Sequence, residues 1–330
     1  MDKKYKVVIT DFIADALAIE KEIIGDTAEV TALDGYNEKD LKGKIEDADA
    51  IITYHTLSIT AETIETLKQC KLIIRAGVGF DNVDHTYARS RNIPVANIPD
   101  YGSEDVADTA IGMMLSLTRG ISFLNSRLRD GLGEWSYTQV QPLTRLRNRN
   151  VGIVGLGRIG TAAALRAKAL GMNVIFYDPH KPDGFDKALG IRRADTLQSL
   201  LEQVEILTLH CPLTTSTHHL INENTLAYLP TGAYLVNTSR GAVVDTSAIP
   251  GAITSGRLSG AAFDVLEQEP PIDDALIQAW KNPEHPAYHK VIINPHSAFY
   301  SEEGLKEIRV KSAQACLRAL KGEEIRNVVN

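Results

Sequence analysis

The sequence has few cysteines and no long apolar run. Cys70, Cys211 and Cys316 are its three cysteines among 330 residues, and no two of them have the spacing of a disulfide framework or a metal-binding pair. No apolar stretch approaches the roughly 20 residues that a membrane-spanning helix needs. Residues 1–10 are charged before a short apolar run, unlike a secretory signal. These absences predict a soluble cytoplasmic protein that binds no membrane.

An excess of positive charge is also absent. Lysine and arginine number 35 against 42 aspartates and glutamates, a formal net charge of −7. Binding of nucleic acid through bulk charge is therefore not expected. Hydrophobic residues at 44% and charged residues at 23% are typical of a folded globular protein. A chain of 330 residues is long enough for two domains.

Short β-branched runs alternate with longer amphipathic stretches, first up to about residue 100 and again after residue 150. Such alternation is typical of βαβ units and parallel sheets. Two series predict two Rossmann-like, doubly wound α/β domains. The predicted strands are Lys6–Thr10, Ala28–Leu33, Ala50–Thr53, Leu72–Arg75, Pro94–Ala96, Asn150–Val154, Asn173–Tyr177, Ile206–Leu209, Ala233–Asn237, Gly260–Val265 and Val291–Asn294.

Helical periodicity predicts helices at Ala14–Ile24 and Thr60–Cys70. Ser103–Arg129 lacks proline and begins with a serine and two acids, which predicts one long helix or two joined helices between the domains. Ser301–Lys321 starts in the same way and predicts a terminal helix. Gln268–Lys290 contains four prolines, so we expect an irregular surface excursion there, with His285 and His289 solvated.

The strongest local signal is a glycine-rich turn, VGIVGLGRIG, at residues 151–160. An apolar strand leads into it and a helix rich in alanine follows. Gly155 permits the tight turn, Gly157 lets a pyrophosphate approach the backbone, and Gly160 lets helix and strand pack closely. The strand and helix on either side make this pattern more specific than its glycines alone. It predicts a dinucleotide-binding site.

Asp178 follows the second strand of this unit, 18 residues after Gly160. A carboxylate at that distance accepts hydrogen bonds from the ribose hydroxyls of NAD and repels the 2′-phosphate of NADP. The alternative is that Asp178 is a helix-capping residue in a turn before Pro179. We predict NAD as cofactor and NADP as less favoured, although His180 and Lys181 leave NADP open.

Three residues with catalytic chemistry each follow a predicted strand. Arg240, Glu269 and His296 stand after the strands that end near residues 237, 265 and 294. Ligands of open parallel sheets bind at the carboxyl ends of the strands, so these side chains are expected to converge on the cofactor cleft. Alone, Arg240 could form a surface salt bridge and His296 could be an ordinary loop histidine.

Together these motifs make the sequence recognisable from about Lys6 to Leu320. It resembles the D-isomer-specific 2-hydroxyacid dehydrogenases, most closely the C-terminal-binding-protein branch. Five ordered motifs carry the resemblance: residues 75–82 (RAGVGFDN), the glycine turn, residues 237–241 (NTSRG), Glu269-Pro270 and Pro295-His296. Residues 54–56 (YHT), 176–179 (FYDP), 209–211 (LHC) and 299–302 (FYSE) indicate the branch.

The resemblance implies an architecture. Residues 1–100 and 298–330 would form a discontinuous substrate domain, and residues 101–297 the NAD-binding domain, with the active-site cleft between them. The crossings at residues 97–101 and 294–298 would act as hinges. A homodimer is also implied, with Trp135 and Tyr137 as candidate contacts or as ordinary aromatic residues.

The resemblance also implies roles. His296 would be the acid and base, Glu269 would stabilise its imidazolium, and Arg240 would bind the substrate carboxylate. The backbone of Val78 and Gly79 would hold that carboxylate from the other domain. The cofactor-binding residues would be Gly155, Gly157, Arg158, Ile159, Gly160, Asp178, His210, Cys211, Pro212, Thr217, Thr238, Ser239, Asp264, His296 and Ala298.

The substrate would be a small 2-oxo or 2-hydroxy acid, contacted also by Tyr54, His55 and Phe299. No lysine or arginine stands beside Tyr54, which disfavours a phosphate group. Phe299 replaces the tryptophan typical of the C-terminal-binding proteins, and residues 272–289 form a longer segment than theirs. The alternative function is an NADH-sensing corepressor or scaffold that binds partner peptides.

A metal site is not predicted. His210, Cys211, His218 and His219 are close in sequence, but their spacing matches no standard metal site. Glu267, two residues before Glu269, is expected to be solvated.

Overall fold

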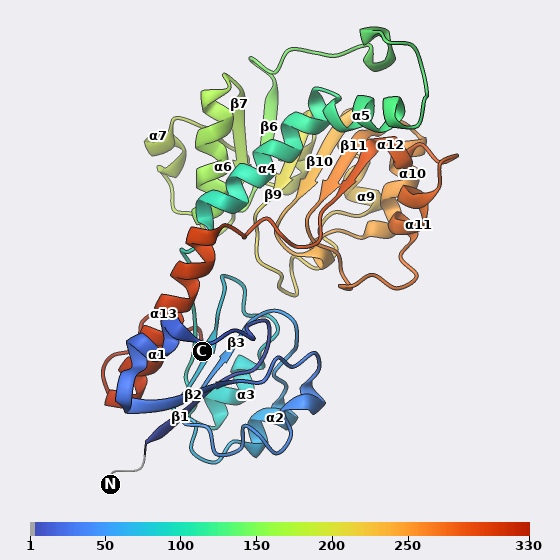
Figure 1. The fold of residues 1–330 in the computed structure, drawn as a ribbon. Coiled ribbons are helices and arrows are strands. Elements are labelled where there is room, and N and C mark those ends of the chain that lie inside the picture. The colour runs from blue at the N-terminus through green and yellow to red at the C-terminus, as the bar shows by residue number, and fades with distance from the viewer. Residues whose placement is uncertain (1–3) are drawn as a thin grey trace. The chain divides into compact units, whose positions relative to one another are not determined.

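The structure is a computed structural model, and it describes residues 4–330. The chain divides into two compact units, one formed by the residues up to Gly102 together with Tyr300–Asn330, the other by Ser103–Phe299. We call them the first and the second unit. In both, a parallel sheet lies between helices (Figure 1).

The first unit contains a five-stranded parallel sheet in the order β2-β1-β3-β4-β5. Its strands are β1 (Tyr5–Ile9), β2 (Ala28–Ala32), β3 (Ala50–Thr53), β4 (Leu72–Arg75) and β5 (Val95–Asn97). The order reverses between β1 and β3, which makes the carboxyl ends of these two strands the switch point of the sheet.

Helices cover both faces of this sheet, as the continuously apolar strands require. On one face α1 (Ala18–Ile24) and α13 (Glu302–Lys321) pack on side chains such as Ile52 and Ile74. On the other face α2 (Ala61–Thr66) and α3 (His85–Ser90) pack on Ile51 and Ile73. The carboxyl-terminal helix therefore completes the fold of the amino-terminal unit.

The second unit contains a seven-stranded parallel sheet in the order β12-β11-β10-β9-β6-β7-β8. Its strands are β6 (Asn150–Val154), β7 (Asn173–Tyr177), β8 (Arg192–Arg193), β9 (Ile206–Leu209), β10 (Ala233–Asn237), β11 (Leu258–Phe263) and β12 (Val291–Ile293). This is the strand order of dinucleotide-binding Rossmann sheets, with the switch point between β6 and β9.

The faces of this second sheet are buried in two apolar clusters. One cluster contains side chains of α4 (Ser103–Thr118) and α6 (Arg158–Ala169). The other contains side chains of five short helices: α8 (Leu197–Leu201), α9 (Glu223–Leu226), α10 (Ile249–Thr254), α11 (Ala275–Lys281) and α12 (Ala287–Lys290). The remaining helices are α5 (Ile121–Arg129) and α7 (Phe185–Leu189), and the 3₁₀ turns are η1 (Gly25–Thr27), η2 (Glu38–Leu41), η3 (Tyr137–Val140), η4 (Gly241–Val243) and η5 (Thr246–Ala248).

The predicted fold class, two Rossmann-like parallel-sheet α/β domains, is confirmed. Every predicted strand is present, with ends displaced by at most two residues. The strand β8 was not predicted, because two arginines at a sheet edge carry no apolar signal. Ser103–Arg129 forms two joined helices, which separate where Gly120 adopts a left-handed conformation with φ of 64°.

Two helix predictions were too long. The first helix begins at Ala18 instead of Ala14, because Leu17 has a left-handed φ of 55° and its N–H binds the Asp15 carboxylate. The second ends at Thr66 instead of Cys70, because Leu67 is extended.

The expectation of an irregular surface excursion at Gln268–Lys290 was wrong in part: residues 268–273 are exposed and irregular, but the segment after them is folded. Helices α11 and α12 form there and bury Leu276 and Ala287 completely. The prolines lie in the turns that flank these helices, where they interrupt no helical hydrogen bond. Both histidines are half-buried instead of solvated. His285 accepts a hydrogen bond from the Ala287 N–H, and His289 Nδ1 lies 2.9 Å from the Ser126 hydroxyl.

Candidate functional site

The glycine turn between β6 and α6 is shaped by close backbone approaches. Gly155 has φ of 85°, and a Cβ there would lie 2.7 Å from the Cys211 nitrogen. A Cβ on Gly160 would lie 2.0 Å from the Gly155 carbonyl oxygen. At Gly157, by contrast, a Cβ would meet no atom within 4 Å. The turn is thus tightly packed at Gly155 and Gly160, whereas the space beside Gly157 is open. The start of α6, which follows Gly157, has no side-chain cap.

Asp178 follows β7 and holds this turn in place. One carboxylate oxygen accepts from the Leu156 N–H at 2.8 Å, and the other accepts from the His180 N–H at 2.9 Å. Asp178 therefore ties the glycine turn to its own turn and does not cap the start of α6. It remains compatible with ribose binding, because each carboxylate oxygen has two lone pairs.

Two buried polar atoms at the carboxyl end of this sheet have no hydrogen-bond partner: Thr238 Oγ1, after β10, and His210 Nδ1, after β9. Burial lowers the pKa of His210 to about 4, so its ring is neutral at physiological pH. Buried polar atoms normally have partners, so these atoms are suited to a polar ligand.

The segment that follows β9 is folded by its own side chains. The Thr217 hydroxyl donates to the Pro212 carbonyl at 2.6 Å and accepts from the Thr214 N–H at 2.7 Å. Burial raises the pKa of the Cys211 thiol to about 11, which keeps it protonated and a poor metal ligand. The predicted residues Cys211, Pro212 and Thr217 thus form one ordered turn against Gly155.

Arg240 lies in a turn organised by a residue that sequence analysis did not assign. The fully buried Asn237 accepts from the Ser239 N–H at 3.0 Å and donates to the Arg240 carbonyl at 2.9 Å. The next residue, Gly241, packs directly on the loop after β11, since a Cβ there would lie 1.9 Å from the Leu266 carbonyl carbon. The arginine turn and the glutamate loop are therefore held together.

Glu269 and His296 form a hydrogen-bonded pair. His296 Nδ1 lies 2.6 Å from Glu269 Oε2, and Glu269 Oε1 accepts from the Leu266 N–H at 2.8 Å. The His296 side chain is 23% exposed and the Glu269 side chain is 35% exposed. The carboxylate is oriented by its own loop and in turn orients the imidazole, as in established acid–base pairs.

Asp264 fixes the backbone on which His296 stands. Its carboxylate accepts from the Ser297 N–H at 2.9 Å and the Ala298 N–H at 3.0 Å, and its carbonyl accepts from the His296 N–H. Burial raises the pKa of Asp264, and the two backbone donors oppose this effect. His296 is held with φ of 50°, a strained conformation for a histidine.

The predicted substrate residues of the first unit follow β3 and β4. Tyr54 is buried, His55 is half-buried, and burial raises the pKa of Tyr54 so that it remains a neutral phenol. Val78 and Gly79 are half-buried, and the Val78 carbonyl accepts from the Asn97 side chain at 2.6 Å. In the second unit, the ring of Phe299 stands edge-on to that of His296, with centroids 6.1 Å apart.

Glu267 is exposed as expected, but it is not simply solvated. Its Oε2 lies 2.9 Å from His219 Nε2, and its Oε1 lies 3.7 Å from His218 Nε2. The two histidine rings stack with centroids 4.0 Å apart. This cluster could not be predicted from the sequence, because Glu267 is 48 residues from His219.

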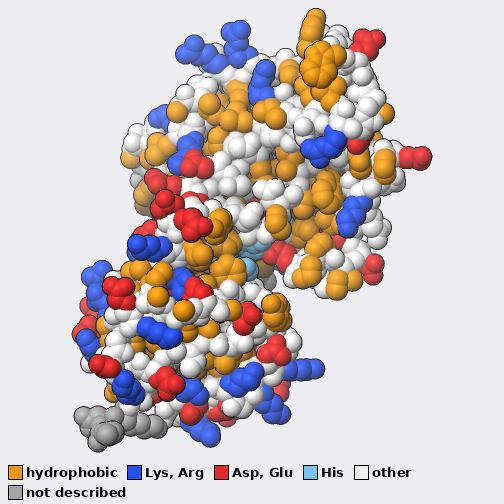
Figure 2. Space-filling model, in the orientation of Figure 1, with side chains coloured by type: hydrophobic (Ala, Val, Ile, Leu, Met, Phe, Trp, Pro, Cys, Tyr) orange, Lys and Arg blue, Asp and Glu red, His pale blue; other side chains and the backbone are white. Residues whose placement is uncertain are grey.

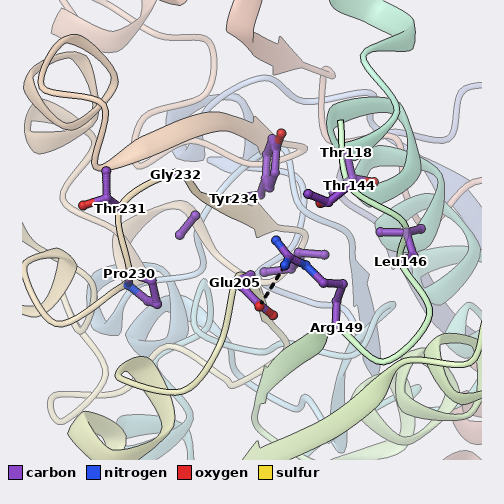
Figure 3. A pocket seen from close by; sticks show the side chains of 11 residues that line it. Thr118, Thr144, Leu146, Arg149, Glu205, Pro230, Thr231, Gly232 and Tyr234 are labelled. Atoms are coloured by element: carbon purple, nitrogen blue, oxygen red, sulfur yellow. Dashed lines mark ion pairs between the residues drawn. The ribbon is translucent and has the colours of Figure 1, made fainter. Parts of the chain in front are cut away.

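A small hollow of about 50 Å³ lies at the amino ends of the strands in the sheet of the second unit (Figure 3). Arg149 and Glu205 form an ion pair of 3.5 Å in its wall, beside Tyr234. These residues stand at the amino ends of β6, β9 and β10, whereas the candidate site occupies the carboxyl ends. The hollow therefore contains none of the candidate catalytic residues.

Comparison with known proteins gives one family match. Residues 111–298 match the model of the family described as "D-isomer specific 2-hydroxyacid dehydrogenase, NAD binding domain". The matched range includes the glycine turn, Arg240, Glu269 and His296.

Sequence similarity to known relatives extends over most of the chain. A D-3-phosphoglycerate dehydrogenase of Methanocaldococcus jannaschii is 35% identical over 98% of this chain, which spans only 59% of that relative's length. A glyoxylate reductase of Korarchaeum cryptofilum is 35% identical over 87% of this chain and 84% of its own. The crystal structure of D-lactate dehydrogenase from Aquifex aeolicus, complexed with NAD and lactic acid, superposes with a TM-score of 0.86 at 28% identity and covers 96% of both chains.

Proposed function

Because this chain belongs to the D-isomer specific 2-hydroxyacid dehydrogenase family, we propose that it is an NAD-dependent oxidoreductase that interconverts a small 2-oxo acid and the D-2-hydroxy acid. The observation that carries the proposal is the Glu269–His296 pair at 2.6 Å, at the carboxyl edge of a Rossmann sheet with an intact glycine turn.

His296 transfers the proton in this proposal. Its Nδ1 is engaged by Glu269, so the opposite ring nitrogen, Nε2, protonates the carbonyl oxygen during reduction and accepts the hydroxyl proton during oxidation. Glu269 stabilises the imidazolium and sets the tautomer. The Asp264 carboxylate fixes the turn that presents the ring.

Arg240 binds the substrate carboxylate through its planar guanidinium, whose paired N–H donors match the geometry of a carboxylate. Backbone N–H groups of Val78 and Gly79 are the proposed second carboxylate contact. Binding at the carboxylate orients C2, so that the arginine contributes to both affinity and alignment.

The cradle between β6 and β9 fits a dinucleotide. Gly157 leaves open space before the uncapped start of α6, and Thr238 Oγ1 and His210 Nδ1 lack partners. The remaining cofactor residues named from the sequence, Arg158, Ile159, Ser239 and Ala298 among them, border the same carboxyl edge. When bound, the nicotinamide would supply or accept a hydride at C2 of the substrate.

Asp178 supports NAD over NADP, since its carboxylate would repel a 2′-phosphate. We further propose that residues 101–297 serve as the cofactor domain and that residues 1–100 with 298–330 serve as the substrate domain. The hinge roles of residues 97–101 and 294–298 belong to the same proposal.

The test is oxidation of NADH, with NADPH in parallel, by a panel of glyoxylate, hydroxypyruvate, pyruvate, phenylpyruvate, oxaloacetate and 4-methylthio-2-oxobutyrate. We expect clear turnover of at least one acid, higher kcat/KM with NADH than with NADPH, and loss of turnover in His296→Ala while NADH still binds. NADH binding without turnover of any acid would instead favour the corepressor or scaffold function.

A further inference from the structure

Phe12 is an exposed aromatic residue with a strained backbone, three residues after the end of β1. Its φ is 68° and 38% of its surface is exposed. A bulky residue other than glycine rarely adopts this left-handed conformation, and such strain gathers at ligand-binding sites. Phe12 was not among the predicted site residues, because an apolar residue after a strand is usually part of the core.

The ring of Phe12 lies against two predicted substrate residues. Its centroid is 5.2 Å from the Tyr54 ring and 4.9 Å from the His55 ring, both in tilted arrangements. We call these three residues the aromatic cluster. Its members come from the ends of β1 and β3, which are neighbours in the sheet.

The position of the aromatic cluster in the sheet points to a ligand. The strand order β2-β1-β3-β4-β5 reverses between β1 and β3, and open α/β sheets bind ligands outside the carboxyl ends at that reversal. On the other side of β3, β4 leads to Val78 and Gly79. Neighbouring strands are roughly 4.8 Å apart, so the carboxyl ends of β1 and β4, which lead to Phe12 and to the proposed carboxylate contact, are about two strand spacings apart. That distance suits the far end of a substrate side chain.

Buried hydrogen bonds hold the aromatic cluster rigid. The fully buried Asp11 carboxylate accepts from the N–H groups of Tyr54 and Thr56, each at 2.8 Å. The Asn82 amide donates to the carbonyls of Tyr54 and Leu57, each at 2.9 Å. The loop that carries Tyr54 and His55 is therefore fixed before any ligand arrives.

We propose that Phe12 is a specificity-determining residue: with Tyr54 and His55 it contacts the side chain of the 2-oxo acid and favours apolar, above all aromatic, side chains over glyoxylate. The inference rests on the proposed function and narrows its substrate class. An aromatic wall without lysine or arginine gives a phenyl group dispersion and stacking contacts, whereas glyoxylate has no side chain that reaches it.

The test compares kcat/KM with NADH for phenylpyruvate and glyoxylate in wild type and Phe12→Ala. We expect wild type to prefer phenylpyruvate, and Phe12→Ala to lower the phenylpyruvate-to-glyoxylate ratio by roughly 10- to 100-fold. The kcat/KM for glyoxylate should change by less than about 3-fold, since only an apolar contact with a side chain is removed.

Tyr36→Ala is the matched control, because Tyr36 is 74% exposed in the same unit but follows β2, away from the reversal. Phe12→Asn serves if Phe12→Ala misfolds, since asparagine tolerates the left-handed region. A ratio unchanged in both Phe12 variants, or a wild type that prefers glyoxylate, would overturn the inference alone. Absence of turnover on every acid would overturn the proposed function and this inference with it.

Discussion

At the scale of single residues, Glu269 is the side chain whose charge the proposed chemistry needs. Glu269→Gln keeps an oxygen for the Leu266 N–H and preserves the size of the side chain, but it removes the negative charge beside His296. We expect kcat to fall by roughly 10²-fold, because an imidazolium formed in the reaction loses its partner. Steady-state kinetics with the best 2-oxo acid measures this.

Glu267→Gln is the matched control for this prediction. Glu267 lies on the same loop and also contacts a histidine, but that histidine is His219. Turnover should stay within a few-fold of wild type. Equal losses in the two variants would show that the loop tolerates no such change, and the assignment of Glu269 would then fail.

His210 makes stability depend on pH. Burial lowers its pKa to about 4 in the folded chain, against 6.5 when solvated. Between these values the unfolded chain binds the proton and the folded chain does not, so folding stability falls as pH drops from 6.5 towards 4. The full shift corresponds to a loss on the order of 3 kcal/mol.

Urea unfolding at pH 7, 6 and 5 measures the effect. His210→Gln should lose less stability than wild type over this range, since its side chain does not titrate. His180→Gln, at an exposed histidine, should follow wild type. Parallel pH profiles for wild type and His210→Gln would refute the prediction.

At the scale of elements, a buried ion pair joins α1 to α13 in the first unit. The guanidinium of Arg309 donates to both carboxylate oxygens of Glu20, each at 2.7 Å, and Glu20 is 1% exposed. Arg309 also donates to both oxygens of Asp15. Hydrogen bonding to the carboxylates raises the pKa of Arg309, and the guanidinium in turn lowers the pKa of Asp15.

Arg309→Ala should destabilise this unit by about 3–5 kcal/mol, because it leaves the carboxylate of Glu20 buried without a counter-charge. The double variant Arg309→Met, Glu20→Leu should recover most of that loss, since apolar replacements of a buried pair are often neutral. Lys311→Ala, at an exposed pair on the same helix, should cost at most about 1 kcal/mol. Chemical denaturation checks all three values, and a double variant no better than Arg309→Ala would contradict the argument.

The elements differ in how well sequence predicts them. Strands such as β3 and β9 were located to the residue, because a strand buried on both faces is a continuous apolar run with polar ends. Helix ends were less certain, because Leu17 and Leu67 terminate helices through backbone conformations that their residue types do not favour. The helices α11 and α12 were missed because prolines signal turns but not what lies between them.

The candidate site shows the same division. Gly155, Gly157, Gly160, Arg240, Glu269 and His296 could be named in advance, since their chemistry and their position after strands are visible in the sequence. Asn237, Asp11 and Phe12 could not, because their roles arise from contacts between distant segments, such as Asp11 with Tyr54 43 residues away. Supporting residues need three-dimensional structure to be found.

At the scale of the whole molecule, the chain carries charges of both signs interspersed over the visible face (Figure 2). No helix within residues 4–330 combines the length and apolarity needed to cross a membrane. Hydrophobic side chains gather at the upper tip of this view, over the loop between α5 and β6. In that loop Trp135 is 91% exposed and Tyr137 is 73% exposed.

Large aromatic residues this exposed are typical of protein interfaces, since Trp and Tyr bury much apolar area at little entropic cost. Ile121, at the start of α5, is 58% exposed, and Leu132, at the start of the loop, is 42% exposed. We therefore predict that wild type is a homodimer and that Trp135→Glu with Tyr137→Glu is a monomer at micromolar concentration. Light scattering after size exclusion measures both states.

Tyr36→Glu, an equally exposed aromatic position in the first unit, should remain dimeric. Carboxylates buried against their symmetry copies cannot be accommodated in an apolar interface, so a dimer that survives both substitutions would place the contact elsewhere. A monomeric wild type would rule out the homodimer itself.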